Sequence, residues 1–234
     1  MWFLVMVIPE VNVISKPIPI THAKVLWGGT FDPIHQGHVL SAIELSQCLG
    51  VHDVALLPNC QPAHRQSPLA TAQQRVQMLS LAIEGHDELA IDTREVDRHG
   101  LSYSVLTMIE VRQEIGPVMP LIWCMGMDAF AGLRQWHRWQ ELLDYGHVLV
   151  LTRPASFWPR DPELLTWYAT HKVDDAKHLL ASSSGQVAHL KLGQHAVSAT
   201  QIRRQLRSGY QPSVTELAPA VAQYIASQSL YGIN

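Results

Sequence analysis

Charged side chains are scarce in this sequence of 234 residues. Asp, Glu, Lys and Arg together make up 16% of it, whereas hydrophobic residues make up 47%. This balance excludes an intrinsically disordered chain and is typical of a globular protein. The 17 basic and 20 acidic residues leave a formal net charge of -3 at pH 7. We therefore expect no general attraction to DNA or RNA and no nucleic-acid partner.

Cysteine is also rare, since only Cys48, Cys60 and Cys124 occur. Their odd number and wide spacing exclude a disulfide framework, and no C-x-x-C pair offers the ligand spacing of a structural zinc site. Unpaired cysteines are typical of a reducing compartment. We therefore expect a cytoplasmic protein that holds no metal ion by its own ligands.

Long hydrophobic runs are missing as well. The most apolar stretch, residues 1–14, is broken by a proline, a glutamate and an asparagine within residues 9–12. It is shorter than the ~20 residues of a membrane span, and it lacks the basic start and cleavage site of a signal peptide. We expect no membrane association. Residues 1–22 are either an irregular or packed extension, or sequence that precedes the true start.

From residue 24 onward, two kinds of pattern alternate along the chain. Short apolar runs typical of strands occur at residues 24–27, 54–57, 89–91, 120–125, 148–151 and 187–192. Between them, helical periodicity occurs at 39–49, 71–84, 103–113 and 141–144. Strands that are apolar throughout are typical of a sheet buried on both faces. The order therefore predicts an α/β fold, a parallel sheet with helices on both faces.

The alternation stops after residue 192. A helix is predicted over 198–207, with Ser198 as its N-cap and Gly209 just beyond its end. A last helix is predicted over about 214–228. No repeat or long linker divides the chain, so we expect one domain over 23–234 with a helical C-terminal portion from about 198.

The segment from Gly28 to His38 offers the clearest chemistry. It joins an apolar strand to an amphipathic helix through two glycines, the arrangement that presents backbone N–H groups and a positive helix dipole to an anion. His35 and His38 lie three residues apart and can share one face of the first helical turn. The segment matches neither the dinucleotide fingerprint nor the P-loop. It therefore predicts a site for a nucleotide phosphate.

Further polar residues follow other strands. They lie at 58–65, 126–128 and 152–154, and in a parallel sheet all of these loops meet at the carboxyl edge with the loop at 28–38. Position alone leaves structural interpretations open. The histidines can be surface or capping residues, Ser198 a plain helix cap, and Arg203 part of a solvated face. Asp128 can bind a ribose hydroxyl or cap a helix.

Two segments of the sequence resemble the signatures of a known superfamily. His35-Gln36-Gly37-His38 is similar to the T/H-x-G-H signature of a nucleotidyltransferase superfamily, and the segment 197–203, Val-Ser-Ala-Thr-Gln-Ile-Arg, is similar to its I-S-S/A-T-x-I-R signature. Within that superfamily the chain from residue 24 to its end resembles the bacterial nicotinate-nucleotide adenylyltransferases. The matching segments are 62–65, 100–104, 126–130, Trp136 and 153–154. The chain has Ala63, Ser104 and His137 where this family often has Pro, Thr and Tyr.

The resemblance implies a Rossmann-like nucleotidyltransferase fold and a reaction of NAD biosynthesis. ATP and nicotinate mononucleotide would give nicotinate adenine dinucleotide and pyrophosphate, with Mg²⁺ accompanying ATP. The 5′-phosphate of the mononucleotide would attack the α-phosphorus of ATP in line, without a covalent enzyme intermediate.

The resemblance also implies site residues. ATP would be bound by Gly28, Gly29, Thr30, Phe31, His35, His38, Gly126, Asp128, Ser198, Thr200 and Arg203. Nicotinate mononucleotide would be bound by His64, Arg65, Tyr103, Ser104, Trp136 and Arg153. His35, His38 and Arg203 would act in catalysis, with His38 nearest the charge that develops at the α-phosphate.

Two alternatives remain open. A sister enzyme would act on nicotinamide mononucleotide or phosphopantetheine, or transfer a cytidylyl group. A protein of another class would bind a nucleotide without catalysis, and would be expected to lack one of the histidines or Arg203. The sequence leaves both a monomer and a homo-oligomer open.

Overall fold

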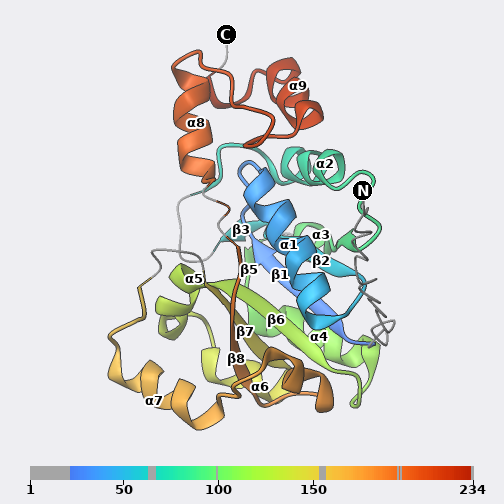
Figure 1. Ribbon diagram of the computed structural model, residues 1–234, viewed down its shortest axis with the longest axis vertical. Helices are drawn as coiled ribbons and strands as arrows, with labels where there is room; N and C mark the ends of the chain where they lie inside the picture. Colours follow the sequence, from blue (N-terminus) through green and yellow to red (C-terminus); the bar gives the residue numbers. More distant parts are fainter. Residues whose placement is uncertain are drawn as a thin grey trace, which may run out of the picture.

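The structure is a computed structural model that describes residues 22–62, 67–98, 100–152, 157–193, 195 and 197–232. A six-stranded sheet crosses the molecule, with the strand order β4-β2-β1-β6-β7-β8 (Figure 1). Its strands are β1 (Lys24–Gly29), β2 (Val54–Pro58), β4 (Leu89–Ile91), β6 (Leu121–Gly126), β7 (His147–Thr152) and β8 (Val187–Lys191). Every neighbouring pair is parallel. The predicted parallel sheet is confirmed.

Alternation along the strands divides the core into two layers. In β1, Val25 and Trp27 belong to one hydrophobic cluster, whereas Leu26 between them belongs to the other, because successive side chains of a strand point to opposite faces. The first cluster is covered by α1 (Gln36–Leu49), α2 (Ala72–Ala82), α8 (Ala199–Arg207) and α9 (Pro219–Ser227). The second is covered by α4 (Ser104–Ile115), α5 (Met127–Ala131), α6 (Leu142–Tyr145) and α7 (Pro162–His171). Helices therefore cover both faces, as predicted.

The last helix is shorter than predicted. It begins at Pro219 rather than near residue 214, because proline fits the first helical position and holds the residue before it, Ala218, in an extended conformation (φ −60°, ψ 138°). The segment before it forms a turn in which the Glu216 carboxylate accepts from the backbone N–H of Ser213 at 2.9 Å. The helix over 198–207 has its serine cap as predicted.

Several short elements escaped the sequence prediction. They are the two-residue strands β3 (Gln61–Pro62) and β5 (Leu101–Ser102), the helix α3 (Arg94–Asp97), and the 3₁₀ turns η1 (Leu133–Gln135), η2 (Trp139–Glu141), η3 (Ala176–Ala181) and η4 (Leu230–Gly232). Helices α5 and α7 were missed too. Most of these are too short to show a period, although α7 has a clear start signal, Asp161 as N-cap followed by Pro162.

The described helices and the cysteines bear on the expectations about membranes and disulfides. Within the described ranges, no helix is long and apolar enough to span a bilayer. All three cysteines are free thiols. The extension over 1–22 lies outside the described residues except for His22, and the single-domain assignment stays a prediction.

The strand order places the functional loops. From β1 the chain runs through α1 to β2 on one side, and β6 adds to the other side of β1, so the order reverses between β1 and β6. Ligands of open α/β sheets bind beyond the carboxyl ends of the strands at such a switch point. The loop at 28–38 and the segment from Gly126 both begin there.

Candidate active site

Two glycines at the end of β1 let a bulky aromatic layer come close to the backbone. A Cβ atom on Gly28 would lie 2.7 Å from the indole of Trp123, and one on Gly29 would lie 2.6 Å from the ring of Phe31. Both distances are too short for any side chain. Phe31 itself has a positive φ of 49°, which turns the chain toward α1. Glycine is therefore needed at both positions, because aromatic rings pack directly against the backbone at the end of the strand.

His35 and His38 lie against each other at the start of α1. His35 is the N-cap residue, and the two imidazole rings stack with centroids 3.7 Å apart and planes 23° apart. Phe31 contacts His38 edge-on, with 5.1 Å between ring centroids. His38 borders the cavity described next, whereas His35 is only 3% exposed. The buried ring of His35 thus packs against His38 without itself bordering the cavity.

A cavity of about 790 Å³ opens at this end of the sheet, which is a typical size for a small-molecule site. It brings together most residues predicted from the sequence: Gly28, Gly29, Thr30, Phe31, His38, Tyr103, Ser104, Gly126, Asp128, Trp136, Thr200 and Arg203. Asp128 is exposed there and makes no helix cap, although α5 begins beside it. Ser198 does not border the cavity, and its hydroxyl caps α8 by accepting from the N–H of Gln201 at 3.2 Å. His64, Arg65 and Arg153 lie outside the described residues.

The second sequence signature touches the loop that leads to the first. The Arg203 guanidinium donates through Nη1 to the carbonyl oxygen of Asp32 at 2.6 Å, and through Nη2 to the Thr200 hydroxyl at 3.3 Å. One end of this contact lies in the loop between β1 and His35, and the other in α8. Two segments that are far apart in the sequence therefore form one wall of the cavity.

Comparison with known proteins agrees with this geometry. Residues 26–205 match the family model described as cytidylyltransferase-like. The probable nicotinate-nucleotide adenylyltransferase of Serratia proteamaculans is 42% identical over 219 residues, which are 93% of this chain and 98% of the relative. That of Hahella chejuensis is 40% identical over 209 residues, 89% of this chain and 95% of the relative. This chain belongs to the nicotinate-nucleotide adenylyltransferase family.

Solved structures agree on the fold. The Plasmodium falciparum nicotinic acid mononucleotide adenylyltransferase complexed with NaAD superposes with a TM-score of 0.67 at 15% identity, over 91% of this chain and 99% of that one. At that identity the likeness concerns the fold alone. It shows that this family member has the α/β nucleotidyltransferase fold that the sequence predicted.

Asp32 holds three parts of this adenylyltransferase together, a role that the sequence did not reveal. Its carboxylate accepts from the N–H groups of Leu69 at 2.9 Å and Ala70 at 3.2 Å, and from the hydroxyl of Tyr231 at 2.7 Å. Tyr231 is buried, and that burial together with the nearby Asp32 charge raises its pKa. The loop between β1 and α1, the segment before α2 and the C-terminal turn η4 therefore meet at one side chain.

Arg75 is a second residue that sequence reasoning missed. Its side chain is fully buried, and it donates to the carbonyl oxygens of Thr30 at 2.7 Å, Asn59 at 2.6 Å and Cys60 at 3.1 Å. Burial lowers the pKa of the guanidinium, while the charge of Asp32 opposes that shift. Arginine stays charged even so. It fastens the loop after β1 to the loop after β2.

The far end of the cavity is aromatic. Tyr103 is the N-cap of α4 and packs on His137 with ring centroids 4.7 Å apart, and Trp136 lies beside them. Glu95 borders this space although it is only 4% exposed, and it accepts from the Thr107 hydroxyl at 2.7 Å. Burial raises the pKa of Glu95. An apolar ring can stack here, and the N–H groups at the start of α4 suit a carboxylate.

Proposed function

We propose that this protein transfers the adenylyl group of ATP to nicotinate mononucleotide, giving nicotinate adenine dinucleotide and pyrophosphate. The observation that carries the proposal is the contact between Arg203 and the Asp32 carbonyl, because it joins the second signature to the loop that leads to the first, at one cavity with His38. The same cavity continues to the aromatic end around Tyr103 and Trp136. One space thus offers a phosphate site and a ring site, as a reaction between two nucleotides needs.

The mechanism follows from these positions. A 5′-phosphate oxygen of the mononucleotide attacks the α-phosphorus of ATP, and the bond from that phosphorus to the pyrophosphate oxygen breaks with its electron pair. No proton transfer is needed to start this step, so the protein acts by positioning and by stabilising charge. His38 and the N-terminus of α1 face the oxygens on which charge develops. Arg203 and Thr200 hold the departing phosphates.

Mg²⁺ is the proposed companion of ATP. No cluster of three or more His, Cys, Asp or Glu side chains suited to a metal ion occurs in the described ranges, so the protein offers no complete set of ligands there. Asp128 is exposed at the cavity and fits a site in which the phosphates supply most ligands. When bound, Mg²⁺ supplies charge neutralisation on the leaving pyrophosphate.

The choice of acceptor and the cellular compartment are part of the proposal as well. A free carboxylate on the pyridine ring would be met by backbone N–H groups near Ser104, which favours nicotinate over nicotinamide mononucleotide. We place the protein in the cytoplasm, in keeping with its three free cysteines.

The test is product analysis with wild type and His38→Ala. Wild type is expected to release nicotinate adenine dinucleotide and pyrophosphate in equal amounts, measured by chromatography. His38→Ala is expected to lower kcat about 10²- to 10³-fold with little change in the KM for ATP, because its contribution is made in the transition state. The exposed His52→Ala variant is the control and should match wild type. Pyrophosphate release without dinucleotide, or an active His38→Ala, would contradict the proposal.

A further inference from the structure

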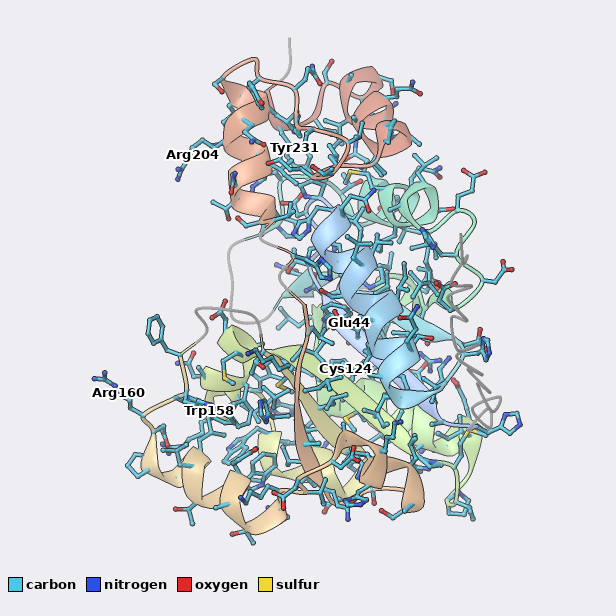
Figure 2. All side chains as sticks on the ribbon, viewed as in Figure 1. Glu44, Cys124, Trp158, Arg160, Arg204 and Tyr231 are labelled. Carbon is cyan, nitrogen blue, oxygen red and sulfur yellow. The ribbon has the colours of Figure 1, made fainter. Side chains whose placement is uncertain are left out.

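A second guanidinium of α8 borders the cavity one turn beyond Arg203. Ala199, Arg203 and Arg207 follow one another at intervals of four residues, so they lie on the same face of the helix, and all three line the cavity. Arg204 lies on another face and points away from the molecule (Figure 2). The helix therefore directs two of its arginines toward the phosphate end and one toward solvent.

The two arginines at the cavity differ in their partners. The Arg203 guanidinium donates hydrogen bonds to the Asp32 carbonyl and the Thr200 hydroxyl, so part of its donor capacity is already used within the protein. The Arg207 side chain makes no hydrogen bond or ion pair with any other residue in the described part of the chain, and it is exposed. Its aliphatic stem is supported, because Gly232 of the C-terminal turn comes so close that a Cβ there would lie 3.4 Å from Arg207 Cγ.

This arrangement lacks a counter-charge. Two like charges four residues apart on a helix repel each other. The described acidic residues at the cavity are Asp32, Glu95 and Asp128, and none of them pairs with Arg207. Asp32 is already engaged by Leu69, Ala70 and Tyr231. An anion in the cavity would supply the missing partner of both guanidinium groups.

We propose that Arg207 binds the terminal phosphates of ATP, beyond the part held by Arg203 and His38. Neither sequence signature includes this residue. A chain of phosphates carries its charges in a row, so successive turns of one helix face can hold successive phosphates, and guanidinium is the side chain best suited to them. The inference rests on the proposed function, since it needs a triphosphate substrate.

The experiment compares Arg207→Ala with Arg204→Ala in steady-state kinetics. Arg207→Ala is expected to raise the KM for ATP about tenfold, the usual effect of losing a hydrogen bond to a charged group. The KM for nicotinate mononucleotide and kcat should change no more than about twofold. Arg204→Ala removes the same charge from the same helix and should leave all three values near wild type. Equal effects of the two substitutions on the KM for ATP would overturn the proposal.

A binding measurement separates this inference from the proposed function. Inorganic tripolyphosphate is titrated into each protein by calorimetry, without any reaction. Arg207→Ala is expected to weaken its binding about tenfold relative to Arg204→Ala, and Arg207→Lys, which keeps the charge, should recover part of the loss. If wild type fails to make the dinucleotide but shows this difference, the proposed function falls and Arg207 remains a polyphosphate residue. If the dinucleotide forms but tripolyphosphate binds both alanine variants equally, the role of Arg207 falls alone.

Discussion

Asp32 shows how a single residue fixes the geometry of the loop between β1 and α1. Its backbone carbonyl orients Arg203, and its carboxylate holds two backbone N–H groups and the Tyr231 hydroxyl. The signature residues around it were predictable, because their types and spacing are local in the sequence. Tyr231 and Arg75 were not, since their partners lie far away along the chain and no period marks them. Contacts of that kind become visible only in three dimensions.

The bond from Tyr231 to Asp32 can be tested by removing one oxygen atom. Tyr231→Phe leaves a buried carboxylate oxygen with one donor fewer, so we expect a loss of about 1.5 to 3 kcal/mol in the free energy of unfolding. Urea denaturation of wild type and variant measures it. Tyr224→Phe is the matched control, because the Tyr224 hydroxyl has no hydrogen bond in the described structure, and it should change stability by no more than about 0.5 kcal/mol. Equal stability of the two variants would contradict a structural role for the hydroxyl.

At the scale of elements, apolar runs located all six strands of the main sheet, with ends within a few residues. They did so because the strands are rich in apolar residues, and the inner strands β2, β6 and β7 are buried along almost their whole length. The two-residue strands β3 and β5 pair only with each other and have no such pattern. The geometry of the candidate site depends on the loops between elements, and side chains such as Arg75 fix the positions of these loops by hydrogen bonds.

Replacing Arg75 by Met tests how the loops after β1 and β2 are held. The substitution keeps much of the buried volume but removes the donors to Thr30, Asn59 and Cys60. Because three carbonyl oxygens lose a charged donor, we expect the free energy of unfolding to fall by about 3 kcal/mol or more, and kcat/KM to fall with it.

Arg75→Lys keeps a charge that can reach some of these oxygens and provides the comparison. It should lose less stability than Arg75→Met and retain more activity. An Arg75→Met protein as stable and as active as wild type would mean that the two loops hold their positions without this side chain.

The stability of the whole molecule depends on pH through buried titratable groups. His147 is fully buried, and its Nε2 donates to the Ser182 carbonyl at 2.9 Å while its Nδ1 accepts from the Gln186 N–H at 3.2 Å. This pair of bonds needs the neutral ring, and burial lowers the pKa of His147. Glu95 is shifted in the opposite sense, since burial raises its pKa.

The sign of the His147 effect follows from proton binding. Below the ordinary histidine pKa of ~6.5, the unfolded chain binds a proton at His147 that the folded chain does not bind. The contribution of His147 to the free energy of unfolding is therefore present above that pH and is lost as the pH falls below it. We expect the stability advantage of wild type over His147→Gln to shrink by up to about 1.4 kcal/mol per pH unit below 6.5. Denaturation curves of both proteins at about pH 7.5, 6.0 and 5.0, on either side of the ordinary histidine pKa, would measure this difference in stability. An advantage that stays constant across them would contradict the assignment.

The choice of acceptor tests the central claim most directly. The purified protein is given ATP with nicotinate mononucleotide, nicotinamide mononucleotide or phosphopantetheine, and kcat/KM is measured for each. An aromatic pocket around Tyr103 and Trp136 with N–H groups at the start of α4 predicts nicotinate mononucleotide as the best acceptor, by about tenfold or more over the amide. A higher kcat/KM for phosphopantetheine or for nicotinamide mononucleotide would contradict the account.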